Sequence, residues 1–346
     1  MVGIIGYGVY IPLYRIKTEE IANTWGRDVD SVKKGLLISE KSVPNIDEDT
    51  VTMSIEASLN ALKRAMIDPK EIGAIYSGSE SPAYAVKPNI SMVANAIGMG
   101  NNYTGADVEF ACKAGTASLQ MVMGLVKSNL IKYGIAIGAD AAEYSVENVG
   151  DQSTGTGSAV FILGNNKNEI VAEIKETVSY SSDVPDFWRR PRMRYPTHAE
   201  RFTGEPAYFK HTVIASQLLM EKTGLKPADF NHVVFHTPNG KFPTRVAKFL
   251  GFSNEQLRNG FVVDKIGNTY SAASLIGLAS VLDDANAGEK IIVTSFGSGA
   301  GSDSFYIEVT DKIESKKNLA RTTKDYLEKK KYVDYTTYLK LTSRIE

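Results

Sequence analysis

The chain has a single cysteine in 346 residues, so no disulfide can form within it. A lone thiol is typical of a reducing compartment, and we expect a cytoplasmic location. The formal net charge of −1 argues against binding to nucleic acid or to an anionic membrane surface. No uninterrupted run of about eighteen apolar residues is present. The first residues lack a basic segment followed by an apolar one, so we expect neither a membrane span nor a signal peptide.

Metal-binding patterns are also missing. The four histidines, His198, His211, His232 and His236, do not pair with one another or with Cys112 at the spacings of zinc sites, so we expect no metal. The composition, 43% hydrophobic and 23% charged, is ordinary for a globular protein. The length is sufficient for two domains or one duplicated domain.

The lone cysteine lies where a buried segment gives way to a helix-forming sequence. Apolar and small residues precede Cys112, and a helical pattern covers residues 113–129. A thiol at a helix N-terminus is close to the positive end of the helix dipole, so we expect a stabilised, nucleophilic thiolate. The alternative is that Cys112 is a small, inert core residue.

The order of predicted elements is repeated in the two halves of the chain. The first half has strand 2–11, helix 51–66, strand 72–76, helices 88–99 and 113–129, and strands 133–139 and 155–163. The second half has helix 209–223, strand 232–235, a helix rich in small residues after residue 272, and strands 290–294 and 304–309. This repetition predicts an α/β fold of two duplicated halves, with a boundary in the polar link 164–182. We therefore divide the chain into 1–166 and 167–346.

Duplication places equivalent strand ends near a pseudo-dyad, so the loops that follow them share one pocket. Glu80 follows a strand of the first half, and His236 follows the equivalent strand of the second half. When the two small-residue helices are aligned, Asn268 falls opposite Cys112. A thiol, an imidazole, an amide and a carboxylate suit acyl transfer through a thioester. Taken singly, a glutamate placed like Glu80 is more often an exposed loop carboxylate than a catalytic group, and a histidine placed like His236 is structural as often as catalytic.

Other segments give weaker signals. The glycine-rich turn around Ser298 can offer backbone N–H groups to an oxyanion. Ser153 and Thr154 form a similarly placed hydroxyl pair, for which an ordinary polar turn is the alternative. The segment 183–208, rich in proline and arginine, is either a phosphate-binding segment or a solvated insertion. The Lys- and Tyr-rich tail after residue 310 indicates a charged surface helix or a partner-docking segment. The other three histidines are assigned structural roles.

The motifs resemble those of the hydroxymethylglutaryl-CoA synthase family in its short archaeal form, within the thiolase/ketoacyl synthase superfamily. The similarity covers nearly the whole chain. It rests on Ser79-Glu80-Ser81 (family Thr-Glu-Ser), Phe110-Ala-Cys112-Lys-Ala-Gly115-Thr (Asn-Ala-Cys-Tyr-Gly-Gly-Thr), His236-Thr-Pro-Asn-Gly-Lys241 (His-x-Pro-x-x-Lys), Gly267-Asn268-Thr-Tyr270 (Gly-Asn-x-Tyr) and Phe296-Gly-Ser298-Gly (Tyr-Gly-Ser-Gly). The chain departs from the family at Lys113, where the family has tyrosine, and at Ala114, where it has glycine.

The resemblance implies a thiolase-like fold with five layers, α-β-α-β-α, and a role for each matching residue. Cys112 would carry an acetyl group, Glu80 would act as general acid/base, and His236 would bind an acetoacetyl thioester. Asn268 would polarise the acetoacetyl group, with Tyr270 in the same motif and Ser298 beside the oxyanion. Lys241 and Arg245 match basic positions that contact coenzyme A phosphates.

The activity implied is condensation of acetyl-CoA with acetoacetyl-CoA to 3-hydroxy-3-methylglutaryl-CoA in the mevalonate route to isoprenoids, with coenzyme A thioesters as substrates and no cofactor. The resemblance also implies at least a dimer, and a complex with acetoacetyl-CoA thiolase and a small zinc-ribbon/OB-fold protein. Two alternatives are a condensing enzyme resembling ketoacyl-ACP synthase III, which needs no base at Glu80, and a non-catalytic thiolase-fold scaffold.

Overall fold

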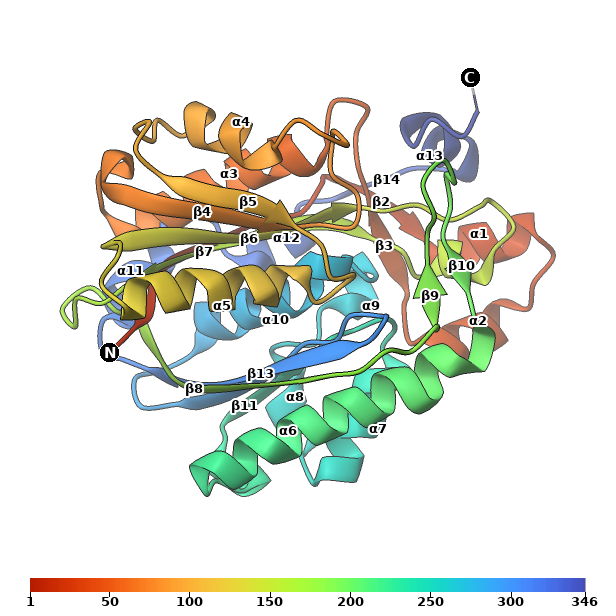
Figure 1. The fold of residues 1–346 in the computed structure, drawn as a ribbon. Coiled ribbons are helices and arrows are strands. Elements are labelled where there is room, and N and C mark those ends of the chain that lie inside the picture. The colour runs from red at the N-terminus through yellow and green to blue at the C-terminus, as the bar shows by residue number, and fades with distance from the viewer. Residues whose placement is uncertain (346) are drawn as a thin grey trace.

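The computed structural model describes residues 1–345, which form five stacked layers (Figure 1). Two helices cover the outer face of one half-sheet, α3 (Thr50–Ala65) and α4 (Asn89–Ala96). Two more lie between the half-sheets, α5 (Ala114–Lys127) and α10 (Ala273–Asp284). The opposite outer layer contains α6 (Phe209–Thr223), α7 (Lys241–Leu250) and α8 (Asn254–Arg258). The predicted α-β-α-β-α arrangement is confirmed.

The two half-sheets have the same strand order, which confirms the predicted duplication. The first runs β1-β7-β6-β4-β5 and the second β8-β13-β12-β11, and a short β1–β8 pairing joins them into one nine-stranded sheet. In both, the outermost equivalent pair is parallel (β4 with β6, β11 with β12), and the remaining equivalent pairs are antiparallel. The strands are β1 (Gly3–Tyr10), β4 (Ile72–Gly78), β5 (Thr104–Val108), β6 (Tyr133–Ala141), β7 (Thr156–Gly164), β8 (Ala172–Ser181), β11 (His232–Phe235), β12 (Lys290–Thr294) and β13 (Gly301–Val309).

The outer helix α3 follows directly from its sequence. The Asp49 carboxylate accepts a hydrogen bond from the Thr52 N–H, and the Thr52 hydroxyl oxygen accepts one from the Asp49 N–H. These two bonds satisfy two otherwise unpaired donors at the helix start. The buried face includes Met53, Ala57 and Ala61. These residues recur at helical spacing and pack on the sheet, so burial of this face stabilises the outer layer.

The central layer requires a close approach between the two halves. A Cβ atom on Gly115, in the first turn of α5, would overlap the carbonyl oxygen of Ser271. A Cβ atom on Gly138, in β6, would overlap the same oxygen. Only glycine permits this contact. As a result, the segment after Cys112 lies against the 3₁₀ turn η6 (Tyr270–Ala272), which comes from the other half.

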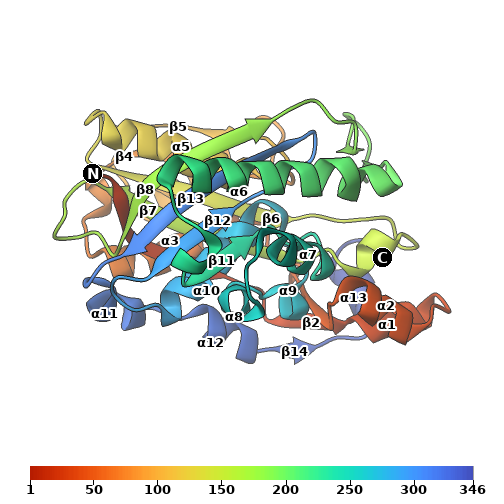
Figure 2. The same ribbon diagram turned by 90° about the horizontal axis from the view of Figure 1, so that it is seen from below.

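The C-terminal tail folds back onto the first half and buries some of its side chains there. Strand β14 (Lys331–Tyr332) adds in parallel to β2 (Tyr14–Lys17), which pairs with β3 (Glu40–Val43). Helix α13 (Tyr335–Leu341) lies beside α1 (Thr18–Thr24), as Figure 2 shows. Its Tyr335 and Tyr338 are buried against Ile16 and other residues of the first half. The prediction of a surface helix or partner-docking face is wrong for these tyrosines, because their rings fill an apolar cluster within the chain. The remaining tail helices are α11 (Ile313–Lys316) and α12 (Thr323–Glu328).

Smaller elements surround one end of the central layer. Near the start of the chain these are α1 (Thr18–Thr24) and α2 (Val29–Leu36). The proline- and arginine-rich segment forms a two-stranded hairpin, β9 (Phe187–Trp188) with β10 (Thr197–His198). Residues 241–266, which carried no helix prediction, form α7, α8 and α9 (Val263–Ile266). Within residues 1–345, no helix is both long and apolar enough to cross a membrane.

Candidate active site

Cys112 lies between the end of β5 and the start of α5, as expected. The preceding Ala111 has a φ of 44°, a left-handed conformation that turns the chain sharply before the helix. Cys112 is 9% exposed and packs with Tyr144 and Tyr270. The thiol is therefore partly open at a junction of the two halves, and it is not sealed in a core.

Glu80 is placed by a carboxylate that sequence reasoning missed. Asp140, at the end of β6, accepts hydrogen bonds at Oδ1 from the Glu80 N–H (2.7 Å) and the Ser79 hydroxyl (2.9 Å). The same oxygen accepts from the Ser81 N–H (3.0 Å) and hydroxyl (2.7 Å). The Oδ2 atom accepts from the Ser271 N–H at 2.9 Å. Asp140 thus ties the loop that carries Glu80 to the turn contributed by the second half.

The protonation of Glu80 and Cys112 differs from the thiolate predicted from the sequence. The pKa of Glu80 is raised to about 8, mainly by burial and further by the charge of Asp140. A hydrogen bond with the Cys112 thiol lowers this pKa and so partly offsets the rise. Burial and the neighbouring Glu80 carboxyl also raise the pKa of Cys112. The predicted thiolate is therefore wrong, because burial of the thiol and the neighbouring Glu80 carboxyl together outweigh the dipole of α5. Cys112 is a thiol beside a carboxyl that can accept or donate a proton near neutral pH.

His236 follows β11 and is 1% exposed. Its backbone N–H donates to the Thr294 carbonyl (2.9 Å), and its own carbonyl accepts from the Tyr208 hydroxyl (2.7 Å). Burial lowers its pKa to about 3, so the imidazole is neutral at physiological pH. The Nδ1 atom has no hydrogen-bond partner among the described residues. A neutral imidazole held by its backbone can orient a carbonyl group without adding a charge.

Asn268 and the hydroxyl pair predicted beside it come together. The Asn268 N–H donates to the Ser153 carbonyl, and the Gly155 N–H donates to the Asn268 carbonyl, both at 2.7 Å. The Asn268 side-chain oxygen accepts from the Tyr270 N–H at 2.9 Å. Thr154 lies behind the tyrosine, with its hydroxyl 3.2 Å from the Tyr270 hydroxyl. Ser153 therefore borders the site, whereas Thr154 supports Tyr270 from outside it.

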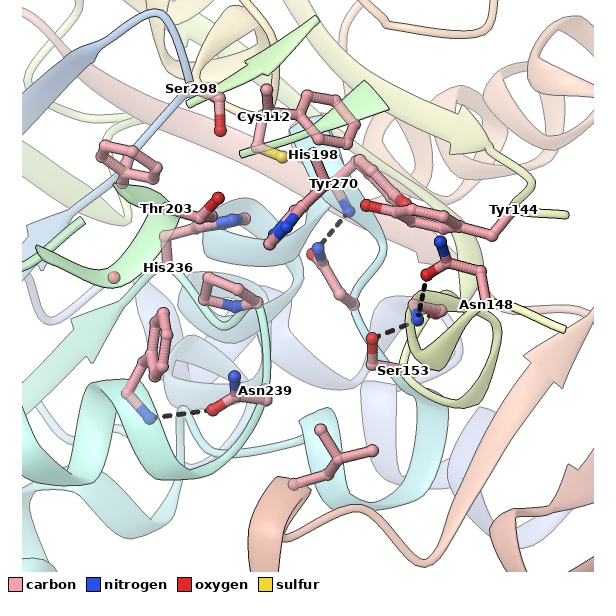
Figure 3. Close-up of a pocket in the computed structure, with 18 of the residues that line it drawn as sticks. Cys112, Tyr144, Asn148, Ser153, His198, Thr203, His236, Asn239, Tyr270 and Ser298 are labelled. Carbon is pink, nitrogen blue, oxygen red and sulfur yellow. Dashed lines mark hydrogen bonds between the residues drawn. The ribbon is translucent and has the colours of Figure 1, made fainter. Parts of the chain in front are cut away.

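A cavity of about 770 Å³ opens onto these groups, and Figure 3 shows Cys112 and Ser298 at one end and Asn239 at the other. Its lining includes the predicted residues Cys112, Ser153, His236, Arg245, Asn268, Tyr270 and Ser298. The exposed Arg245 pairs with Glu205 at 3.0 Å and stacks on the Phe209 ring. Lys241 is exposed at the start of α7 and is not among the lining residues. The volume is in the range of cavities that bury most of a small organic ligand.

Glu80 borders a second, smaller cavity of about 310 Å³. Phe187 and Tyr270 line both cavities and therefore lie between them. The rest of the smaller cavity is lined by Ser81, Ala141, Ala142, Glu143, Arg189, Arg194 and Pro196. The thiol and the carboxyl thus interact with each other but line different cavities.

The departure from the family motif at Lys113 has a structural counterpart. Lys113 is 6% exposed, and its Nζ lies 3.1 Å from Oδ2 of the fully buried Asp303. The same oxygen accepts from the Thr116 hydroxyl at 2.9 Å, while the Ser179 hydroxyl donates to Oδ1 at 2.7 Å. A Cβ atom on Gly297 would lie 2.7 Å from the Lys113 Cβ. This buried ion pair therefore fixes the loop that carries Ser298 against the start of α5.

Several residues at the site were not found from the sequence. Tyr144 packs on Cys112, and Phe187 and His198 line the larger cavity. His198 had been assigned a structural role. Asp186 accepts from the Gly299 N–H at 2.8 Å and so holds the glycine-rich turn. An acidic residue at the end of a buried strand is a signal that could have revealed Asp140. Segment 183–208 was interpreted from its prolines and arginines, and these do not point to Asp186, Phe187 or His198.

Comparisons with known proteins find relatives along the whole chain. The hydroxymethylglutaryl-CoA synthase of Methanocaldococcus jannaschii is 56% identical over 346 residues, covering 100% of both chains. That of Methanopyrus kandleri is 54% identical, covering 100% of this chain and 98% of the relative, and that of Thermoplasma acidophilum is 53% identical, covering 100% and 98%. Residues 220–309 match the family described as 3-oxoacyl-[acyl-carrier-protein (ACP)] synthase III C terminal.

Solved structures share the fold at low sequence identity. MvaS in complex with 3-hydroxy-3-methylglutaryl coenzyme A superposes with a TM-score of 0.90 at 22% identity, over 99% of this chain and 91% of that one. The 3-oxoacyl-(acyl carrier protein) synthase III, FabH, of Pseudomonas aeruginosa gives 0.82 at 16% identity, over 89% and 98%. The thiolase-like fold class is thereby confirmed.

Proposed function

The chain belongs to the hydroxymethylglutaryl-CoA synthase family, and we propose that its site condenses acetyl-CoA, acetoacetyl-CoA and water to 3-hydroxy-3-methylglutaryl-CoA and coenzyme A. The proposed pathway is the mevalonate route to isoprenoids. One observation supports the reaction above all. The buried Glu80 carboxyl, whose pKa is about 8, forms a hydrogen bond with the thiol of Cys112, the only cysteine in the sequence. Cys112 in turn lines one end of the larger cavity.

In the first step the Cys112 sulfur attacks the thioester carbon of acetyl-CoA. The oxyanion that forms is stabilised by the Cys112 N–H and by the loop carrying Ser298, which lines the same cavity. Coenzyme A then leaves as the free thiol, since its sulfur takes up the proton that the Cys112 thiol loses, and an acetyl thioester remains on Cys112. The Lys113–Asp303 pair supports this geometry, because it joins the start of α5 to the Ser298 loop.

In the second step the Glu80 carboxylate removes a proton from the acetyl methyl group. The raised pKa makes this carboxylate a stronger base than an exposed glutamate. The carbanion attacks the C3 ketone of acetoacetyl-CoA, which neutral His236 and the amide of Asn268 orient, with Tyr270 and Ser153 beside them. Glu80 then returns its proton to the new alkoxide, and water releases the product from Cys112.

The coenzyme A arm is assigned to the larger cavity. Arg245 lines its wall, and Lys241 lies one helical turn away at the exposed start of α7. Both side chains can approach phosphate groups, which favour arginine and lysine. Thr154 acts indirectly, through the hydroxyl of Tyr270. We propose coenzyme A thioesters and water as the substrates, with no metal or further cofactor.

The assembly remains a proposal. We propose at least a homodimer, in complex with acetoacetyl-CoA thiolase and a small zinc-ribbon/OB-fold protein, in the cytoplasm. We place the boundary between the halves at 166/167, since β7 ends at Gly164 and β8 begins at Ala172.

The match of residues 220–309 to a ketoacyl synthase domain favours one competing reaction, decarboxylative condensation. That chemistry obtains its carbanion by loss of carbon dioxide and needs no base at Glu80. In Glu80→Ala we expect acetyl-Cys112 to form, because acylation removes no C–H proton, while condensation falls by at least a thousandfold. Intact-protein mass spectrometry and product formation report the two steps separately. Unchanged turnover in this variant would contradict the proposal.

A scaffold without catalytic activity is tested by labelling. Incubation with radiolabelled acetyl-CoA, together with the proposed partner proteins, should place one acetyl group on Cys112. Cys112→Ser serves as the control that takes up no thioester label. Absence of label on the wild-type chain would favour the scaffold.

A further inference from the structure

We propose that the smaller cavity, on the Glu80 side of the site, is the entrance for the water that hydrolyses the enzyme thioester. This inference rests on the proposed function, because it concerns the last step of that reaction. It starts from the division described above. Cys112 lines the larger cavity and not the smaller one, whereas Glu80 lines the smaller cavity and not the larger one.

The chemistry of the last intermediate requires a second entrance. After condensation, the six-carbon acyl group is attached to Cys112 at one end and is still a coenzyme A thioester at the other. The coenzyme A arm therefore stays in the larger cavity while the Cys112 thioester is hydrolysed. Water arriving from that side would have to pass the arm that fills its path.

The partition between the cavities is built from rigid aromatic groups. Tyr270 is 4% exposed, and its hydroxyl lies 3.2 Å from that of Thr154. Phe187, the other shared residue, packs on Tyr144 with ring centroids 6.3 Å apart. These rings restrict the passage of a pantetheine chain toward Glu80 but leave the smaller cavity free for small molecules.

The size and lining of the smaller cavity suit water. Its volume of about 310 Å³ holds roughly ten molecules at ~30 Å³ each. Ala141 and Ala142 keep the inner wall short, and the exposed Arg189 and Arg194 stand on the rim. Arg189 donates to the Glu80 carbonyl at 3.0 Å. Charged and small residues together make a hydrated opening instead of an apolar binding site.

Glu80, which lines the smaller cavity, has one side-chain oxygen with no hydrogen-bond partner among the described residues. The Oε1 atom of Glu80 is buried and makes no hydrogen bond with any described residue. An unpaired buried oxygen is costly, and a water molecule supplied from the smaller cavity would satisfy it. Such a water would lie beside the Glu80 carboxylate, which is the base. Because Glu80 contacts the Cys112 sulfur, the same water would also lie near the acyl group on Cys112.

The hydrolytic step balances with the groups present. The water oxygen bonds to the acyl carbon while the carbon–sulfur bond to Cys112 breaks. One water proton passes to the Glu80 carboxylate, and Glu80 then gives a proton to the departing Cys112 thiolate. The products are the free carboxylic acid and the restored thiol, and no other reactant is needed.

The test fills the smaller cavity and follows each step in a single turnover. Wild-type enzyme and Ala142→Leu are acetylated, mixed with acetoacetyl-CoA, quenched in acid at increasing times and analysed by intact-protein mass spectrometry. In Ala142→Leu we expect the condensed coenzyme A adduct to accumulate on Cys112 and to decay at least tenfold more slowly. The decay rate is compared with the acetylation rate of the same variant, because Ala142 also packs against the cluster of Cys112, Tyr144 and Tyr270. Ala83→Leu is the matched control, because Ala83 is a partly buried alanine that borders neither cavity; it should keep wild-type rates.

A second variant guards against a folding defect at Ala142. Pro196→Leu enlarges a side chain at another wall of the smaller cavity and should slow adduct decay in the same way. Adduct decay at the wild-type rate in both folded variants would overturn the inference. Failure of the wild-type enzyme to form acetyl-Cys112 or product would instead refute the proposed function, so the two failures are distinguishable.

Discussion

Replacement of Asp140 by asparagine tests how this carboxylate controls Glu80. Asp140 is fully buried and accepts five hydrogen bonds, from Ser79, Glu80, Ser81 (two) and Ser271. Asparagine has nearly the same shape, but one of its two terminal groups is a donor. Whichever way the amide is turned, at least one N–H or O–H donor is left facing another donor.

The magnitudes follow from these contacts. Loss of one hydrogen bond to a charged acceptor lowers the free energy of unfolding by about 2 kcal/mol. Removal of the negative charge also lowers the pKa of Glu80 below about 8, while burial, the larger cause, keeps it above the ordinary value of 4.5. A loop shifted by about 1 Å reduces the rate with fully ionised Glu80 by about a hundredfold.

The assay separates these effects by measuring condensation alone across pH. Acetylated enzyme is mixed with acetoacetyl-CoA in a quenched-flow instrument between about pH 6 and 9.5. Since Glu80 acts as a carboxylate, the wild-type rate should rise with pH through an apparent pKa of about 8, and about one tenth of Glu80 is ionised at pH 7. In Asp140→Asn the rise should occur at lower pH and reach a lower plateau.

Asp107→Asn is the matched control. Asp107 is a partly buried carboxylate that accepts from the Asn89 N–H (2.6 Å) and the Ile90 N–H (3.2 Å) at the start of α4. Its replacement should lower stability without moving the kinetic pKa. The reasoning is refuted if folded Asp140→Asn keeps the wild-type kinetic pKa, or if Asp107→Asn shifts it as much.

Two further predictions concern buried ion pairs. Lys113→Met should lower the free energy of unfolding by about 3 to 5 kcal/mol in urea titrations, because Asp303 remains buried without its cation. A double variant, Lys113→Met with Asp303→Leu, should recover most of this loss. A single variant as stable as wild type would contradict the prediction. Burial raises the pKa of Asp151, but the Lys41 and Arg344 cations together lower it below its ordinary value, so Asp151 stabilises the fold above its unfolded pKa and loses that contribution on acidification. Asp151→Asn should therefore be destabilised at pH 7, with a gap from wild type that closes as the pH falls towards about 2; a gap independent of pH would argue against it.

The repeated order of elements made most of the fold predictable. Helix α3 has clear helical periodicity, and strands β6 and β7 are continuous apolar runs. The duplication then fixes which strand ends meet. For this reason Cys112, His236 and Asn268 were expected at one pocket, whose wall they share. Helix α7 was missed because Pro243 stands near its start, although proline is compatible with a first helical turn.

The sequence did not reveal groups that act across long separations. Asp140 binds a loop about sixty residues earlier and a turn more than a hundred residues later, and no local pattern encodes such contacts. Helix-dipole reasoning gave the wrong direction for the pKa of Cys112, since it omitted burial and the facing Glu80. The tail was interpreted from its charge, but burial of the Tyr335 and Tyr338 rings against the first half is what stabilises its docked position.

The tail also sets the order in which the site can be completed during synthesis. Arg344 reaches Asp151 at 2.7 Å in η2 (Val149–Gln152), the turn that precedes Ser153 in the cavity wall. Arg344 therefore anchors a wall made of residues translated about two hundred positions earlier. A nascent chain can fold its first half-sheet early, but it gains a rigid substrate cavity only after Arg344 has left the ribosome.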